Sequence, residues 1–250
     1  MAHPSAPALP VLLDCWQSTL GWRPTDVQQA QFQALYEQIL VANRSLNLTR
    51  ITEPEEFWEK HLWDSLSGVQ WMLANPAEVA SSRLIDIGTG AGFPGVPVAI
   101  ALPQLSVTLM DSTRKKILFL DGFIEQLPLP NAQTVSDRVE ALGQDPHHRE
   151  QYDLATLRAV AAANVCAEYA LPLVAVGGHA VLYRGQWTPE EEKKLAIAAK
   201  SLGGAIAQVE QFSTPLSHSI RTCIHLQKVA PTPSEFPRGV GVPSQKPLGG

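Results

Sequence analysis

The stretch R-L-I-D-I-G-T-G-A-G-F-P-G, residues 83–95, determines how the rest of the chain is organised. Its first half is a short apolar run that contains one carboxylate, Asp86, and leads directly into a cluster of glycines. An apolar run that ends at a glycine turn is typical of a buried parallel strand followed by a ligand-binding loop. The glycines permit a sharp turn and a close approach of backbone N–H groups to a ligand. We therefore predict a nucleotide-binding turn here.

Two cofactors are compatible with this turn. Gly90 begins a match to the dinucleotide pattern G-x-G-x-x-G, and Asp111 follows about 20 residues on, where that pattern places an acid. Asp86, however, would face a pyrophosphate unfavourably, whereas it would suit the ammonium group of S-adenosylmethionine. We therefore favour S-adenosylmethionine over NAD, and a glycine turn that binds nothing is the third alternative.

The composition is that of an ordinary globular protein, with 45% hydrophobic and 17% charged residues among 250. Its apolar runs are too short for a membrane span, and its first residues lack the pattern of a leader peptide. A net charge of -5 restricts any nucleic-acid contact to local basic clusters. The three cysteines lack the spacing of a metal site. We expect a soluble cytoplasmic monomer with no metal and no membrane partner.

The chain divides into three regions by pattern. Residues 1–80 have helical periodicity, with helices expected to begin near Thr25 and Glu53. Residues 81–230 alternate between strand and helix, which is the signature of a parallel α/β sheet. Seven strands are expected, at 84–87, 106–110, 133–135, 152–156, 179–183, 205–212 and 220–229. The last two form an antiparallel pair, so the fold class is α/β with a Rossmann-like, mostly parallel sheet and one reversed strand. Residues 231–250 form a tail.

Polar side chains stand at strand ends and on one helix face. Asp111 ends the second strand, where an acid can accept both ribose hydroxyls of an adenosine or can cap the next helix. His61 and Asp64 lie three positions apart on one helical face. They could form a functional pair, although we favour the simpler alternative that they hydrogen-bond to each other and to the adjoining turn.

A set of motifs resembles one known family. The motifs are N-L-T, H-L-W-D-S-L, D-I-G-T-G-A-G-F-P-G, D-S-T-R-K-K-I-L-F-L, R-V-E, R-A-V and P-R-G-V-G-V-P-S-Q-K-P-L, within residues 32–248. Together they are similar to the bacterial 16S ribosomal RNA guanine-N7 methyltransferases, called RsmG or GidB. The resemblance implies a class I methyltransferase fold and an S-adenosylmethionine-dependent enzyme. Its implied substrate is N7 of a guanine in small-subunit ribosomal RNA.

The resemblance also implies the site. It assigns cofactor contacts to Gly88, Phe93, Val139, Glu140 and Arg158, with Asp111 at the ribose. From the residues themselves we add Asp86 and Gly90. Arg184 stands where the family has a lysine and is a candidate for positioning the substrate. The candidate RNA contacts are Arg114, Lys115, Lys116, Arg238 and Lys246.

The chemistry needs few side chains. Guanine N7 has a free lone pair, so methyl transfer from a sulfonium requires no proton to be removed from the attacking atom. Holding N7 in line with the methyl group and excluding water can supply the catalysis, and we name no acid or base. The alternatives are a small-molecule methyltransferase, an NAD oxidoreductase and a non-catalytic RNA-binding protein.

The tail, residues 231–250, is rich in proline and glycine and lacks apolar periodicity. Composition alone is compatible with a disordered end. Arg238 and Lys246 face a single acid, Glu235, and the prolines favour an extended arm that loses little entropy on docking. We therefore expect an arm that lies along the cofactor cleft and contacts RNA phosphates. On this expectation, removing the residues after Ala230 weakens RNA binding and leaves cofactor binding largely intact.

Overall fold

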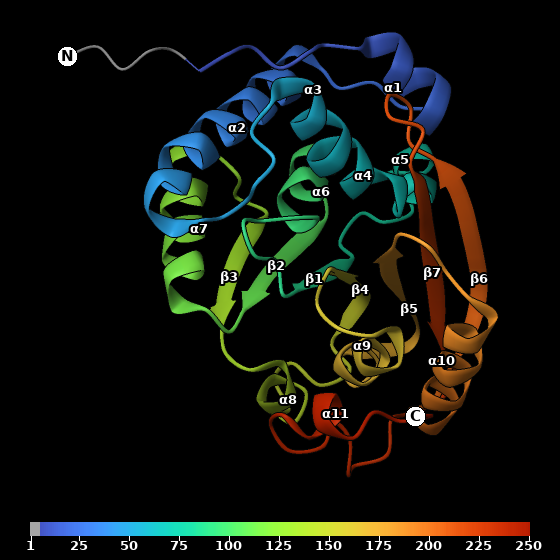
Figure 1. Ribbon diagram of the computed structural model, residues 1–250. Helices are drawn as coiled ribbons and strands as arrows, with labels where there is room; N and C mark the ends of the chain where they lie inside the picture. The colour runs from blue at the N-terminus through green and yellow to red at the C-terminus, as the bar shows by residue number, and fades with distance from the viewer. Residues whose placement is uncertain (1–5) are drawn as a thin grey trace.

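A seven-stranded sheet with helices on both faces forms the centre of the computed structural model, which describes residues 6–250 (Figure 1). The strands are β1 (Arg83–Ile87), β2 (Ser106–Asp111), β3 (Ala132–Ser136), β4 (Tyr152–Arg158), β5 (Val174–Arg184), β6 (Gly204–Ser213) and β7 (Ile220–Lys228). Their order is β3-β2-β1-β4-β5-β7-β6, and β7 runs in the direction opposite to the other six. The predicted Rossmann-like sheet with one reversed strand is therefore confirmed. The expectation about a leader peptide falls partly on residues 1–5, outside the described residues.

The sheet separates two hydrophobic cores, because successive side chains of a strand point to opposite faces. Leu84, Val107 and Leu109 pack with the N-terminal helices in one core. Ile85 and Ile87 pack with the C-terminal helices in the other. Both faces of the central strands are thus buried, which explains their continuous apolar runs.

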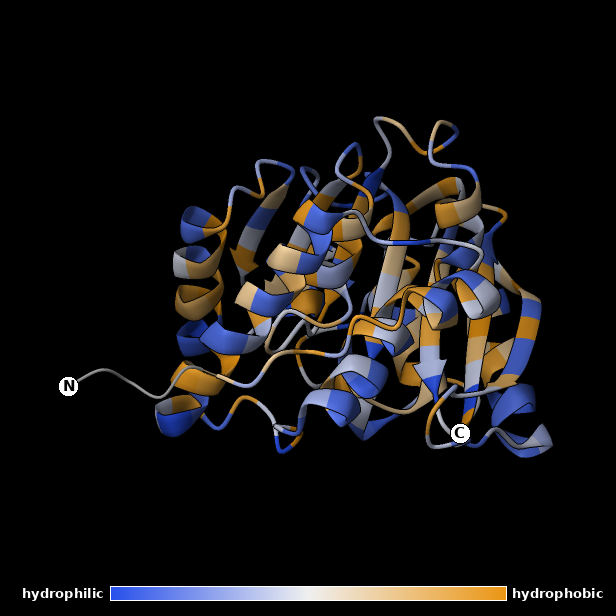
Figure 2. Cartoon of the chain, turned by 90° about the horizontal axis from the view of Figure 1, so that it is seen from above, coloured by the Kyte–Doolittle hydropathy of each residue, from blue (hydrophilic) through white to orange (hydrophobic). Residues whose placement is uncertain are grey.

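The helices on one face are α2 (Asp26–Leu46), α6 (Gly95–Ala101) and α7 (Arg114–Gln126), and those on the other are α9 (Ala163–Ala170) and α10 (Pro189–Ser201). The shorter ones are α1 (Leu13–Leu20), α3 (Pro54–Phe57), α4 (Asp64–Ser67), α5 (Gln70–Ala74), α8 (Val139–Leu142) and α11 (Val242–Gln245). The peripheral helices carry both hydrophobic and hydrophilic bands, as helices with one buried face should (Figure 2).

The first predicted helix begins where expected. Thr25 Oγ1 accepts a hydrogen bond from Gln28 N, and the Gln28 side chain accepts one from Thr25 N, which is a capping box. The second predicted helix is interrupted: a π-helical turn, Trp58–Trp63, joins α3 to α4. Such turns often occur at functional sites because they redirect side chains.

The N-terminal helices share a core with the sheet. Phe32 and Ile39 of α2 and Leu62 belong to the same buried cluster as Leu84 of β1. The boundary at residue 80 is therefore a change of sequence pattern within one packed structure. Within residues 6–250, no helix has both the length and the apolar character needed to cross a membrane. The same residues contain no group of three or more His, Cys, Asp or Glu side chains that could hold a metal ion.

Candidate functional site

Two adjoining cavities lie at the edge where the parallel strands end. The larger, of about 560 Å³, is lined by residues that include Phe93, Arg158 and Arg184. The smaller, of about 360 Å³, is lined by residues that include Asp111 and Val139. Gly88, Lys116 and Ala159 line both. Ligands of open α/β sheets bind at this edge, so the two cavities are the candidate site.

The glycine turn follows β1 at the border of both cavities. Gly88 and Gly90 have φ angles of 69° and 62°, a left-handed conformation that side chains with a Cβ rarely adopt. A Cβ at Gly88 would also lie 2.8 Å from Val160 Cγ2. The turn therefore needs glycine at this point.

Asp86 lies beneath the turn and does not line either cavity. The side chain is fully buried, with Oδ2 accepting from Gly95 N at 2.8 Å and Oδ1 from Thr156 Oγ1 at 3.0 Å. Burial raises the pKa of Asp86 to about 6. We expected Asp86 to contact a cofactor ammonium group, but its geometry assigns it to joining the turn, α6 and β4.

Asp111 accepts hydrogen bonds from the start of α7 and from the glycine turn. Its Oδ1 accepts from Thr113 N at 2.8 Å, at the start of α7, and its Oδ2 accepts from Gly90 N at 3.0 Å. Each carboxylate oxygen can accept two hydrogen bonds, so both keep capacity for a ligand in the smaller cavity. The Lys116 ammonium lies 3.7 Å from Oδ2.

Val139 and Glu140, adjacent in the chain, differ in exposure to the cavity. Val139 lines the smaller cavity, whereas Glu140 is buried behind it. Glu140 Oε1 accepts from the backbone N of Gly241 at 2.9 Å. Its Oε2 is buried and has no hydrogen-bond partner among residues 6–250.

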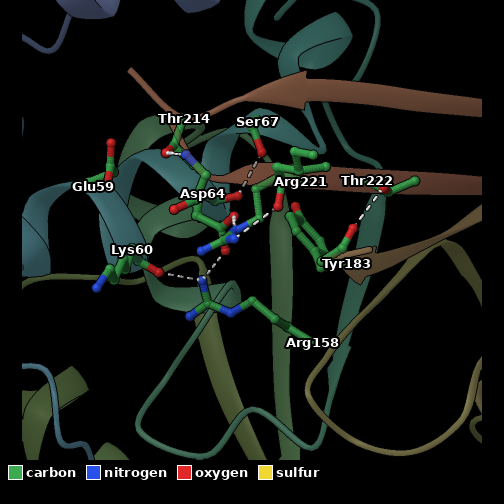
Figure 3. Close-up of polar contacts among 12 residues, drawn as sticks. Glu59, Lys60, Asp64, Ser67, Arg158, Tyr183, Thr214, Arg221 and Thr222 are labelled. Atoms are coloured by element: carbon green, nitrogen blue, oxygen red, sulfur yellow. Dashed lines mark hydrogen bonds and ion pairs between the residues drawn. The ribbon is translucent and has the colours of Figure 1, made fainter. Parts of the chain in front are cut away.

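Two arginines converge on Asp64 at the wall of the larger cavity (Figure 3). Arg158 Nη1 donates to Asp64 Oδ2 at 2.7 Å, and Arg221 Nε donates to Asp64 Oδ1 at 3.1 Å. Arg158 comes from the end of β4 and Arg221 from the start of β7, so one carboxylate ties two distant strands to α4. Charge-assisted bonds of this kind fix the guanidinium planes.

His61 does not pair with Asp64 in the hydrogen bonds of residues 6–250; Arg158 approaches both side chains instead. The His61 ring stacks on Phe93, with centroids 4.3 Å apart, and its Nε2 lies 2.8 Å from Thr49 Oγ1. Burial, followed by the charges of Arg158 and Lys60, lowers the pKa of His61 to about 3. The imidazole is therefore neutral near physiological pH.

The remaining basic candidates are dispersed. Arg184 lines the larger cavity, donating to Ala161 O at 2.8 Å and pairing with Glu191 at 3.4 Å. Arg114 and Lys115 are exposed at the start of α7, and Lys246 is exposed in the tail. Arg238, expected at an RNA phosphate, instead forms a bidentate pair with the buried carboxylate of Glu168.

The residues at the cavities that were not predicted from the sequence include Arg221, Tyr183 and Ser244. The position of Arg221 in the sequence could have indicated its place at the site. Because β7 runs antiparallel to β5, its first residues lie at the edge where the parallel strands end. A basic residue at the start of the reversed strand therefore falls beside the ligand site.

Comparisons with known proteins identify the family of this chain. The family model for rRNA small subunit methyltransferase G (GidB) matches residues 28–220. Ribosomal RNA small subunit methyltransferase G of Nostoc punctiforme is 59% identical over 240 residues, covering 96% of this chain and 98% of that protein. The protein of the same name from Trichodesmium erythraeum is 56% identical over 241 residues, covering 96% and 94%.

Solved structures share the fold at low identity. A 16S rRNA (adenine(1408)-N(1))-methyltransferase from Catenulisporales acidiphilia with cosubstrate SAM has a TM-score of 0.52 and 17% identity, covering 64% of this chain and 91% of that one. The antibiotic-resistance methyltransferase Kmr has a TM-score of 0.52 and 18% identity, covering 64% and 92%. At this identity the likeness extends to the fold alone.

Proposed function

Because this chain belongs to the rRNA small subunit methyltransferase G family, we propose that it methylates N7 of a guanine in small-subunit ribosomal RNA. The methyl donor of such an enzyme is S-adenosylmethionine. The observation that carries the proposal is the pair of adjoining cavities, one with a strand-end carboxylate and the other with three arginines. The first suits an adenosine and the second suits a polyanionic substrate.

The smaller cavity fits the cofactor by its donor and acceptor set. Asp111 has acceptor capacity for ribose hydroxyls, and Val139 offers an apolar wall for an adenine. The buried Oε2 of Glu140, adjacent to Val139, is a further acceptor. Gly88, which borders both cavities, would contact the cofactor where they meet, and Gly90, Phe93 and Arg158 would hold its methionine part in the larger cavity. When bound, S-adenosylmethionine supplies an electrophilic methyl group.

The larger cavity suits RNA. Its lining includes five basic side chains, Lys60, Lys116, Arg158, Arg184 and Arg221, against one acid, Asp64. In a chain with net charge -5 this is a local concentration of positive charge. Arg158 and Arg221, held by Asp64, and Arg184 are positioned to orient a base and its phosphates, while Arg114, Lys115 and Lys246 extend the basic rim. A guanine N7 in a loop is reachable there, whereas the narrow A-form major groove would hide it.

No side chain needs to accept a proton in this reaction. N7 attacks through its own lone pair, so the residues act by holding it in line and by excluding water. The neutral His61, stacked on Phe93, forms part of the wall. We further propose that the enzyme acts in the cytoplasm, because its proposed substrate is small-subunit ribosomal RNA, and that it acts as a monomer.

The direct test is transfer of label. The full chain is incubated with methyl-labelled S-adenosylmethionine and unmodified small-subunit RNA, both naked and assembled, and the modified base is mapped. Labelling of one guanine at N7 is the expected result, with large-subunit RNA as the control. RNA binding without labelling would instead support a non-catalytic binding protein, and labelled small molecules without labelled RNA would support a small-molecule methyltransferase.

Replacing Asp111 by Ala is expected to weaken S-adenosylmethionine binding by about 1 to 3 kcal/mol, the range for hydrogen bonds to a charged group. The affinity is measured by calorimetry on the folded variant. Glu125, an exposed acid on α7, gives a matched control, because Glu125→Ala should bind like the unmodified chain. Equal affinities of the Asp111 and Glu125 variants would remove Asp111 from the site.

The rate of methyl transfer should be nearly independent of pH around neutrality. The pKa of His61 is lowered to about 3, so its ring stays neutral at those pH values, and N7 needs no base. Single-turnover rates at saturating RNA and cofactor provide the measurement. A steep rise with a midpoint near 6.5, the ordinary histidine value, would mean that a histidine takes part as a base.

A further inference from the structure

The tail forms part of the wall of the smaller cavity. Ser244, in α11, lines this cavity together with Asp111, Val139 and Tyr169. With the ribose proposed at Asp111, the lining residues Val139, Tyr169 and Ser244 remain for the adenine. A segment far along the chain thus borders the place where an adenine would lie.

A buried ion pair anchors the tail before Ser244. Glu168 of α9 is fully buried, and its Oε1 accepts from both Arg238 N and Arg238 Nε at 2.9 Å. Arg238 Nη2 donates to Glu168 Oε2 at 2.6 Å. A buried carboxylate is costly unless it is paired and hydrogen-bonded, so Arg238 satisfies a group that the fold has already buried.

Two more bonds fix the tail on either side of Ser244. Gly241 N donates to Glu140 Oε1 at 2.9 Å, and Asn164 Nδ2 donates to Leu248 O at 2.6 Å. The anchors lie on α8 and α9, the same helices that supply Val139 and Tyr169 to the cavity. Helices α8 and α9 therefore both hold the tail in place and shape the smaller cavity.

We propose that residues 238–248 are a cofactor-binding element that closes the adenosine end of the site. The inference rests on the proposed use of S-adenosylmethionine. It replaces our expectation that the tail is an RNA-binding arm whose loss spares cofactor binding, because the guanidinium of Arg238 is committed to Glu168. Lys246 keeps an exposed charge on the outer side.

The test compares cofactor affinity with and without an anchored tail. The double variant Glu168→Gln/Arg238→Ala removes the anchor without leaving a buried charge unpaired. Calorimetry with S-adenosylhomocysteine, the unreactive product, should give a Kd at least about 10-fold higher than that of the full chain, equivalent to one 1.4 kcal/mol step. Ser244→Trp, a change at an exposed position that leaves the anchors intact, should also weaken binding, because the larger side chain obstructs the cavity.

Controls separate this inference from the proposed function. Glu235→Ala, a change at an exposed acid that precedes the anchored segment, should leave the Kd unchanged, and thermal unfolding without ligand should be similar for Ser244→Trp and the full chain. Ligand should also slow amide hydrogen exchange across 238–248. If the full chain binds the ligand but both tail variants bind within about twofold of it, the inference fails and the proposed function stands. If the full chain itself does not bind, the proposed use of the cofactor fails.

Discussion

Replacing Asp64 by Asn is expected to lower the single-turnover rate of methyl transfer about 100-fold, the loss associated with a misplacement of about 1 Å at the reacting atoms. Asp64 accepts from Arg158 and Arg221 with different oxygens, at 2.7 Å and 3.1 Å. In the asparagine side chain, one of those oxygens is replaced by an NH2 group. This group and the guanidinium that it faces are both hydrogen-bond donors, so the hydrogen bond between them is lost. One arginine must then move, and the larger cavity loses its fixed geometry.

A neighbouring carboxylate provides the matched control. Glu59 is as deeply buried as Asp64, but its Oε1 accepts from the backbone N–H groups of Leu216 and Ser217 and from no arginine that lines the cavity. Glu59→Gln keeps that oxygen and removes the same charge, outside both cavities. It should therefore leave the rate near that of the unmodified chain. A full rate in Asp64→Asn would mean that Arg158 and Arg221 need no fixed orientation for catalysis.

The strands and the glycine turn could be predicted because their signals are local. The apolar run of residues 84–87 and the glycines that follow it form β1 and its loop as expected. The helix expected from residue 53 onward could not be foreseen in detail. The point at which α4 ends depends on packing against another part of the chain. Tyr183 packs so closely against Gly68, which follows α4, that a Cβ at Gly68 would lie 2.6 Å from Tyr183 Oη. Tyr183 comes from β5, so the constraint is tertiary.

The two strand-end carboxylates show that local sequence alone does not tell which of them borders the cavity. Asp86 and Asp111 both precede loops, and the sequence suggested a cofactor role for each. In the sheet, Asp86 lies opposite Leu109, two residues short of Asp111, and α6 covers it. A shift of two residues along the strands therefore decides whether a carboxylate lies beneath α6 or borders the cavity. That register is set by strand pairing, which the sequence does not show.

Charge pairs between distant segments were the least predictable features. Asp64 and Arg221 are 157 positions apart, and Glu168 and Arg238 are 70 apart. The sequence identifies the basic residues but does not show which acidic side chains they pair with in the folded structure. Arg238 was therefore assigned to RNA from its local surroundings, whereas the fold brings it to a buried carboxylate.

Replacing Gly95 by Ala is expected to lower the free energy of unfolding by about 3 kcal/mol or more and to abolish cofactor binding. Gly95 is buried at the start of α6, where an added Cβ would overlap Leu109 Cδ2 and lie 2.8 Å from Asp86 Oδ2. Overpacking of this kind costs about 1 to 3 kcal/mol, and displacing the Asp86 carboxylate from Gly95 N adds about 1 to 3 kcal/mol.

The measurement is urea unfolding of Gly95→Ala beside Gly122→Ala. Gly122 lies within α7, and an added Cβ there meets no atom within 4 Å. The second substitution should therefore raise stability by about 0.5 to 1 kcal/mol, the usual gain of alanine over glycine in a helix. The two variants add the same methyl group, so any difference between them comes from the surroundings. Equal stabilities would show that the turn tolerates a side chain at residue 95 and that Asp86 does not hold α6 against β1.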